Sequence, residues 1–263
     1  MYVFFDIDGT LISHRGISHI PDETRIAIDA LKAHGHVPAI ATGRAAFLAM
    51  NAAKEFGIEY LVCSGGAEVI VRGRKIHEKY FPDEHIESFR RVAERFPKFS
   101  AAVDDRYLYA GNAFEDFFAY FNSQAGYDCI RPLSEMKRMI ICYIMLPHET
   151  LTPEHGIFYA HPEGVRLELM HQFTEARHES ASKWNGIELL IANEGSSLDD
   201  VIVFGDGPND IEMLERANIG VAVGRAGDDV KSHADYVCED IDDGGILKAC
   251  YELGIVGMGQ ELI

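Results

Sequence analysis

The chain has 263 residues, of which 47% are hydrophobic and 25% charged, and this composition excludes an intrinsically disordered or collagen-like protein. A formal net charge of −18 disfavours nucleic acid and anionic membrane surfaces as partners. The longest apolar run, residues 139–146, is too short to cross a bilayer.

The cysteines predict free thiols rather than a structural framework. All five are widely spaced and form no C-x-x-C pair, so neither a disulfide scaffold nor a zinc ribbon is indicated. The N-terminal apolar run has no basic leader and is interrupted by Asp6, so we expect no signal peptide. Reduced thiols then predict a cytoplasmic protein. The oligomeric state stays open between a monomer and a weak homodimer.

The first part of the chain alternates strands and helices. A buried strand leads into Asp6, and residues 11–20 predict a short hairpin or flap that turns at Arg15-Gly16. Pro21 suits the first position of a helix, and Gly35 suits its C-terminal cap. A strand at 37–41, a helix to about Phe56 and a strand at 60–63 follow. This order predicts a right-handed parallel sheet covered by helices.

A different pattern of helices and strands begins near Pro82 and ends near residue 180. The pattern there predicts an α+β segment with an antiparallel sheet, and Asp104-Asp105 reads as a hairpin turn. We therefore expect residues 81–179 to form an inserted domain between residues 1–80 and 180–263, which form the core. The elements expected in the insert are a helix at 83–96, a strand region at 100–109, a helix at 113–124, and strands at 139–146 and 165–170.

The parallel pattern then returns. The expected elements are helices at 183–192, 210–215, 228–232 and 244–253 and strands at 201–204, 220–223 and 235–238. The predicted fold class is α/β, a doubly wound parallel sheet of the Rossmann-like type with an inserted α+β domain.

Two acidic residues directly follow the first strand. Unpaired carboxylates cannot lie in a strand's apolar core, so Asp6 and Asp8 are expected at its carboxyl end, where open α/β sheets bind ligands. Two acids this close usually share a cation or a proton. The alternative is a plain acidic turn, because Asp-Gly is a common turn dipeptide.

Three further features favour the functional interpretation of this pair. Each lies at the carboxyl end of a predicted parallel strand or just beyond a connection, so the sheet delivers all of them to one crevice. Carboxylates without His or Cys partners indicate Mg²⁺, which prefers oxygen ligands. A hydroxyl and an ammonium group can hold phosphoryl oxygens. The features are Thr42, Lys183 and the Asp206–Asn209–Asp210 loop.

These residues resemble the motifs of the haloacid dehalogenase-like (HAD) hydrolase superfamily, and specifically its Cof-type (subfamily IIB) phosphatases. The resemblance covers residues 1–80 and 180–263, while the inserted segment matches only in length and α+β character. The matching motifs are Asp6-Ile7-Asp8-Gly9-Thr10, Thr42-Gly43-Arg44, Lys183, and Gly205-Asp206-Gly207-Pro208-Asn209-Asp210.

The resemblance implies a role for each matching residue. Asp6 would be the nucleophile that forms a phosphoaspartate, and Asp8 would protonate the leaving oxygen and then activate water. Thr42 and Lys183 complete the implied catalytic set. The implied Mg²⁺ ligands are Asp6, the backbone carbonyl of Asp8, Asp206 and, in support, Asp210. The implied phosphate-binding groups are Thr42, Lys183, Asn209 and the amides of Ile7 and Gly43, with Arg44 either contacting substrate or capping a surface.

Two positions depart from the family pattern. Gly65 stands where similar proteins often carry Asn, which puts the leaving-group contact at that position in doubt. Lys183 is followed by Trp184 rather than Gly, and we expect this indole to pack against the inserted domain or, alternatively, to contact substrate.

The function expected from these observations is a Mg²⁺-dependent phosphatase. Its substrate would be a small phosphorylated metabolite, such as a sugar phosphate or cofactor phosphate, because a large inserted domain closing over the crevice would exclude polymers. One alternative is a phosphomutase or phosphotransferase that uses the same phosphoaspartate. Another is a non-catalytic sensor of a phosphorylated ligand.

Overall fold

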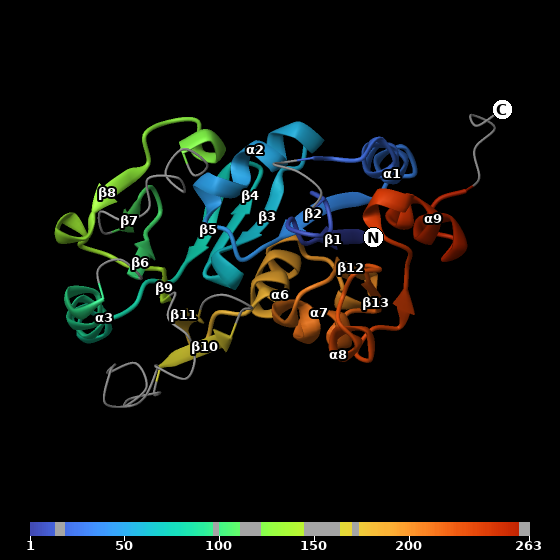
Figure 1. Cartoon of the computed structure of the whole chain (residues 1–263). Helices are drawn as coiled ribbons and strands as arrows, with labels where there is room; N and C mark the ends of the chain where they lie inside the picture. The colour runs from blue at the N-terminus through green and yellow to red at the C-terminus, as the bar shows by residue number, and fades with distance from the viewer. Residues whose placement is uncertain (14–18, 97–99, 111–121, 145–163, 170–173, 258–263) are drawn as a thin grey trace.

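The computed structural model of the chain describes residues 1–13, 19–96, 100–110, 122–144, 164–169 and 174–257 (Figure 1). Within these residues an eight-stranded sheet forms the centre of the molecule. In spatial order its strands are β14 (Tyr236–Val237), β13 (Ile219–Ala222), β12 (Val201–Gly205), β1 (Tyr2–Phe5), β2 (Val37–Ala41), β3 (Tyr60–Cys63), β4 (Glu68–Val71) and β5 (Arg74–Glu78).

Strand β1 lies in the middle of this sheet and pairs in parallel with both β12 and β2. From β1 the chain winds outward through β2 and β3, and after the insertion it winds the other way through β12, β13 and β14. The winding direction therefore reverses beside β1, which is where doubly wound sheets bind ligands. On the far side of β3, strands β4 and β5 add an antiparallel hairpin.

Helices cover both faces of the eight-stranded sheet, with one group above and one below it in Figure 1. Alternate residues of β1 supply the two cores: Val3 and Phe5 pack on one face, and Phe4 packs on the other. A strand buried on both faces must be apolar throughout, as this one is. The helices on the Val3 face are α1 (Asp22–Ala33), α2 (Ala46–Phe56) and α9 (Gly245–Glu252), and those on the Phe4 face are α6 (Lys183–Glu194), α7 (Ile211–Arg216) and α8 (Asp228–Lys231).

A second, six-stranded sheet lies between β5 and α6 in the sequence. Its spatial order is β10-β11-β9-β6-β7-β8, and its pairings are antiparallel except for β7 with β8. Helix α3 (Asp83–Arg95) packs on one of its faces through Phe89 and Val92. The opposite face contributes Val103 and Leu108 to a cluster with Leu48 of α2. The strands are β6 (Ser100–Val103), β7 (Leu108–Ala110), β8 (Ile130–Pro132), β9 (Ile141–Ile144), β10 (Val165–Leu169) and β11 (Thr174–His178).

The predicted fold class is confirmed, and the structure adds strands that the sequence did not indicate. These are the hairpin β4–β5, the short β8 and the strand β11. The expected turn at Asp104-Asp105 joins β6 to β7. The expected turn at Arg15-Gly16 and most of the expected helix at 113–124 fall outside the described residues. Ser13 and His19, which flank that turn, form an antiparallel bridge.

All five cysteines are buried and free of disulfides, as expected from their spacing. Over the described ranges no helix combines the length and apolar character that crossing a membrane requires.

Candidate active site

Acidic residues from two neighbouring strands meet at the carboxyl edge of the eight-stranded sheet. Asp6 follows β1, and Asp206 and Asp210 belong to the loop that follows β12. Because β1 and β12 are parallel neighbours, their ends lie side by side, and the Asp6 amide donates a hydrogen bond to the Phe204 carbonyl at 3.0 Å. One carboxylate oxygen from each of the three acids lies within 4.8 Å of the others.

Lys183 joins this acidic cluster from the first turn of α6. Its Nζ donates hydrogen bonds to Asp6 Oδ1 at 2.8 Å and to Asp210 Oδ1 at 2.5 Å. The Lys183 side chain is only 1% exposed, so these ion pairs are almost completely shielded from water. The Ser182 side chain caps the helix by accepting a hydrogen bond from the Asn185 amide, which fixes the start of α6.

The loop after β12 is built around the Asp210 carboxylate. Its Oδ2 accepts hydrogen bonds from the amides of Asp206 at 3.0 Å and Gly207 at 2.9 Å. A side chain at Gly205 would come within 2.6 Å of the Asp210 carboxyl group, so glycine is needed there. Asp206 in turn accepts a hydrogen bond from Thr10 Oγ1 at 2.9 Å. Both oxygens of Asp210 therefore already accept hydrogen bonds from the protein. This suits a residue that supports a metal site from behind better than one that binds the metal directly.

Crowding and burial shift the protonation of the cluster. Burial raises the pKa of Asp6 to about 7, and the charges of Asp210 and Asp8 act in the same direction against Lys183. Burial together with Asp6 and Asp210 raises the pKa of Asp206 to about 8. Burial alone would lower the pKa of Lys183, but the carboxylates of Asp210 and Asp6 outweigh it and raise that pKa. Without a metal, Asp6 and Asp206 therefore keep their protons to a higher pH than an exposed aspartate does.

This donor set fits a magnesium ion. It offers only oxygen ligands, without a nitrogen or sulfur ligand that would favour zinc. A divalent cation would add positive charge to a cluster in which three carboxylates face one ammonium group. Asp6 and Asp206 are the side chains placed to bind it, with Asp210 behind them.

Asp8 lies in a different environment from Asp6, although only Ile7 separates them. Its side chain is 51% exposed, and the Arg44 guanidinium grips it with two hydrogen bonds: Nε to Oδ2 at 2.9 Å and Nη2 to Oδ1 at 2.5 Å. Arg44 Nη1 also donates to Gln124 Oε1 at 3.1 Å. The sequence left Arg44 between a substrate contact and a surface cap, and in the structure its guanidinium binds Asp8.

The segment after β2 brings the predicted phosphate-binding groups next to the acidic cluster. Thr42 is buried, and its amide donates to the Val62 carbonyl at 2.8 Å. Asn209 Nδ2 lies 3.7 Å from the point where a Cβ on Gly43 would stand, so the β2 and β12 loops meet here. In the β1 loop the buried Ile7 carbonyl accepts backbone hydrogen bonds from residues 10, 11 and 12, which makes a tight turn.

A buried carboxylate that the sequence analysis missed supports this segment from behind. Glu68 of β4 is fully buried, and its Oε2 accepts hydrogen bonds from Ser64 Oγ at 2.7 Å and from the Ala46 amide at 3.2 Å. The Ser64 amide donates to the Arg44 carbonyl at 2.8 Å. Glu68 therefore fixes both chain segments that flank Thr42, Gly43 and Arg44. An acid inside the run Ala67–Val71 was the available signal, because such a residue needs buried partners.

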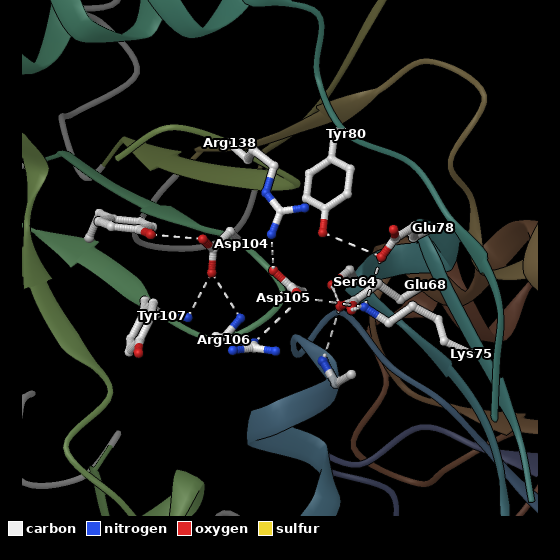
Figure 2. Close-up of polar contacts among 12 residues, drawn as sticks. Ser64, Glu68, Lys75, Glu78, Tyr80, Asp104, Asp105, Arg106, Tyr107 and Arg138 are labelled. Carbon is white, nitrogen blue, oxygen red and sulfur yellow. Dashed lines mark hydrogen bonds and ion pairs between the residues drawn. The ribbon is translucent and has the colours of Figure 1, made fainter. Parts of the chain in front are cut away.

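A line of charges runs from Glu68 into the six-stranded sheet, as Figure 2 shows. Lys75 Nζ lies 3.1 Å from Glu68 Oε1 and 4.0 Å from Asp105 Oδ2. Asp105 Oδ1 accepts a hydrogen bond from Arg138 Nη2 at 2.9 Å. The two sheets are thus joined by ion pairs beside the candidate site as well as by apolar contacts.

Trp184 is buried in the core below the eight-stranded sheet. It is 2% exposed and packs in the cluster of Phe4 and Val203, and its indole nitrogen donates to Glu188 Oε1 at 2.7 Å. The guanidinium of Arg216 stands 5.2 Å above its ring. Packing was expected for this residue, but the partner is the core sheet rather than the inserted region.

Known proteins share both the sequence pattern and the fold of this chain. The model of the haloacid dehalogenase-like hydrolase family matches residues 3–250. A Bacillus subtilis (strain 168) protein named "Putative phosphatase YkrA" is 28% identical over 256 residues, which cover 97% of this chain and 98% of that protein. The 5-amino-6-(5-phospho-D-ribitylamino)uracil phosphatase YcsE of the same organism is 23% identical, with 94% of this chain and 93% of that protein covered.

Solved structures extend the likeness to the whole fold. The HAD subclass IIB sugar phosphatase BT4131 superposes with a TM-score of 0.84 at 29% identity, over 97% of this chain and 99% of that one. These findings confirm the resemblance, the α/β fold class and the enzyme class predicted from the motifs. The chain therefore belongs to the haloacid dehalogenase-like hydrolase family.

Proposed function

We propose that this protein is a Mg²⁺-dependent phosphatase that hydrolyses a small phosphorylated metabolite through a phosphoaspartate at Asp6. The observation that carries the proposal is the buried cluster of Asp6, Asp206 and Asp210 on Lys183, placed next to Gly43 and Asn209. An unbalanced group of carboxylates beside donors suited to phosphate is an arrangement that supports phosphoryl transfer.

The chemistry divides between two carboxylates. Asp6 attacks phosphorus, and its new O–P bond forms as the bond between phosphorus and the leaving oxygen breaks. Asp8 gives that oxygen a proton and later takes one from the attacking water, which releases phosphate and restores Asp6. The exposed position of Asp8 suits a group that exchanges protons with substrate and water.

The remaining residues bind the phosphate group and offset the charge of the carboxylates. Asp6, the Asp8 carbonyl and Asp206, with Asp210 in support, would hold a magnesium ion, which would supply positive charge to offset that of the phosphoryl group. Lys183 offsets the charge of Asp6 and Asp210. Thr42, Asn209 and the amides of Ile7 and Gly43 donate hydrogen bonds to the phosphate.

We further propose that residues 81–179 act as a cap on a core formed by residues 1–80 and 180–263. Strand β5 ends at Glu78 and α6 begins at Lys183, so the chain leaves the eight-stranded sheet and returns to the helices that cover it close to these boundaries. Contacts from this region, such as Gln124 on Arg44, reach the site itself. A cap of this size suits small substrates and shields the site from bulk water.

The test is phosphate release from p-nitrophenyl phosphate. With Mg²⁺ the wild-type protein is expected to release inorganic phosphate, and chelation of the metal or Asp6→Asn is expected to abolish release. Asp29→Asn, which changes an exposed acid on α1, serves as the matched control and should leave the rate unchanged. Transfer of phosphate to an added alcohol without net release would favour a phosphotransferase. Ligand binding without turnover of any ester would contradict the proposal.

A further inference from the structure

Strand β11 of the cap carries two charged side chains toward the candidate site. Glu175 and Arg177 alternate with Ala176, which packs into the cap's own core with Phe89. Successive residues of a strand face opposite sides, so the two charged side chains face away from that core. Both are nonetheless buried, Glu175 to 5% and Arg177 to 1% exposure, which places them at the junction of cap and core.

Glu175 reaches the segment that is proposed to bind phosphate. Its Oε2 lies 3.7 Å from the position that a Cβ on Gly43 would take, and Asn209 Nδ2 lies 3.7 Å from the same position. A cap carboxylate and a core amide therefore flank Gly43 together. A carboxylate so near a phosphate dianion would repel it unless a cation offsets its charge.

Arg177 supplies that cation and fits a space that the core leaves open. Its Nη1 donates a hydrogen bond to Glu175 Oε1 at 2.9 Å. Gly65 has a φ of +58°, and a Cβ there would stand 2.0 Å from Arg177 Nη1 and 2.8 Å from Cζ. The Gly65 amide donates to the Thr42 carbonyl at 3.0 Å. The missing side chain at Gly65 is thus what admits the guanidinium beside Thr42.

A buried pair of this kind is poorly explained by stability, because an apolar pair of similar size would serve as well or better. A substrate-binding role explains it better. An ionised carboxylate accepts hydrogen bonds and donates none, so its natural partner in a ligand is a hydroxyl or amine hydrogen. The phosphate end of a substrate is held by core residues, so this partner belongs to the alcohol part, close to the ester oxygen.

We propose that Glu175 is a specificity-determining residue that binds a hydrogen-bond donor on the alcohol part of the substrate, and that Arg177, seated against Gly65, is the positioning residue that holds it there. This inference rests on the proposed phosphatase function. It assigns the chain to phosphate esters that carry a hydroxyl or amine near the ester oxygen.

Glu175→Gln tests the substrate contact. The probes are glycerol 3-phosphate, ribose 5-phosphate and phosphoethanolamine, which carry such donors, and p-nitrophenyl phosphate, which does not. For the best substrate among the first three, kcat/KM should fall about tenfold to a hundredfold, the range expected for one hydrogen bond to a charged group. For p-nitrophenyl phosphate it should change less than about twofold. Glu179→Gln, which alters an exposed acid on the same segment, should change neither.

A double-mutant cycle tests whether the position of Arg177 depends on the space left open at Gly65. Gly65→Ala should displace the guanidinium and reproduce the selective loss seen in Arg177→Ala. Adding Gly65→Ala to Arg177→Ala should then have little further effect, because the group that it displaces is already gone. Arg177→Lys should recover part of the selectivity. The double variant relieves the clash with the guanidinium but keeps the backbone strain of a side chain at a φ of +58°, so the comparison uses the ratio of kcat/KM for the donor-bearing ester to that for p-nitrophenyl phosphate, which a loss of folded protein does not change.

The outcomes separate this inference from the proposed function. If the wild-type protein hydrolyses none of the esters, the phosphatase function itself is wrong. If it hydrolyses p-nitrophenyl phosphate but none of the donor-bearing esters, or if Glu175→Gln slows all substrates equally, only the role of Glu175 is wrong. Multiplicative effects of Gly65→Ala and Arg177→Ala would contradict the seating of Arg177.

Discussion

Asp6 and Asp8 show how differently two acids can be placed within one turn. The Asp6 side chain is 9% exposed and ion-paired to Lys183, whereas that of Asp8 is 51% exposed and held by Arg44. Asp6 belongs to a buried cluster whose charge is only partly neutralised, and burial raises its pKa to about 7. Asp8 faces solvent and the guanidinium of Arg44, whose side chain is 11% exposed.

The proposed mechanism gives separate tasks to the two carboxylates, and their difference in burial fits that division. A group buried in an acidic cluster suits binding of a metal, because a cation offsets the charge of the carboxylates, and it is shielded from the water that would compete with it for phosphorus. A group at the mouth of the site suits proton exchange with substrate and water. Substitutions in the buried cluster should therefore lower the free energy of unfolding, whereas substitutions of Asp8 should lower turnover alone.

Asp8→Asn should lower turnover and leave folding intact. We expect kcat to fall by more than the ~10²–10⁴-fold typical of a general acid or base, because Asp8 serves both half-reactions. The free energy of unfolding should change by less than about 0.5 kcal/mol, since the side chain is half exposed. Steady-state kinetics and urea unfolding measure the two effects.

Asp128→Asn is the matched control, because Asp128 is an exposed aspartate that also pairs with an arginine, Arg131. It should affect neither quantity. Near-normal turnover in Asp8→Asn would remove the acid–base role from Asp8.

Lys183→Met should destabilise the fold by removing the positive charge from the buried cluster. Removing one member of a buried ion pair leaves uncompensated charge, so the free energy of unfolding should fall by about 3–5 kcal/mol without added metal. Urea unfolding at pH 7.5 measures this loss. Lys54→Met, at an exposed position on α2, should leave stability nearly unchanged. An equally stable Lys183→Met protein would show that the ion pairs of Lys183 with Asp6 and Asp210 do not support the fold.

The smallest expected effect is a pH dependence of metal stabilisation. Asp6 and Asp206 have raised pKa values of about 7 and about 8, so the metal-free folded protein holds protons that the unfolded chain releases near pH 4. Their contribution to stability is thus present at low pH and is lost as pH rises toward 8. Mg²⁺ replaces those protons, so it should raise the melting temperature more at pH 8.5 than at pH 5.5.

Differential scanning fluorimetry should show the two gains differing by a few degrees, about 2–4 °C for each 1 kcal/mol. In Asp206→Asn the difference should shrink. An equal gain at both pH values would mean that the metal does not bind at these carboxylates.

The sequence predicted most of the core of the site because the residues there, apart from Lys183 at the start of α6, follow apolar strands that the sequence shows clearly. Apolar runs end at Asp6, Thr42 and Asp206, and the parallel topology brings such ends together. The orientation of individual side chains was harder to predict from the sequence. Whether Arg44 faces substrate or Asp8, and which sheet buries Trp184, depends on packing that no local pattern encodes.

The cap was harder to predict, for a physical reason that β11 illustrates. Its sequence, Thr-Glu-Ala-Arg-His, lacks apolar alternation because one of its faces is charged and buried against the core. The burial of Glu175 and Arg177 can be recognised only once the fold places Gly43 near the first and Gly65 against the second. The β4–β5 hairpin did leave a signal, since Arg72 and Gly73 both adopt positive φ in its turn and Gly marks such turns.

Chemical trapping of the phosphorylated protein tests the central claim most directly. Borohydride reduces an acyl phosphate on aspartate to homoserine, and peptide mass spectrometry locates the changed residue. With Mg²⁺ and p-nitrophenyl phosphate present, we expect homoserine at position 6, and none without substrate or in Asp6→Asn. Phosphate release that proceeds while position 6 stays unmodified, or homoserine at another aspartate, would contradict the role assigned to Asp6.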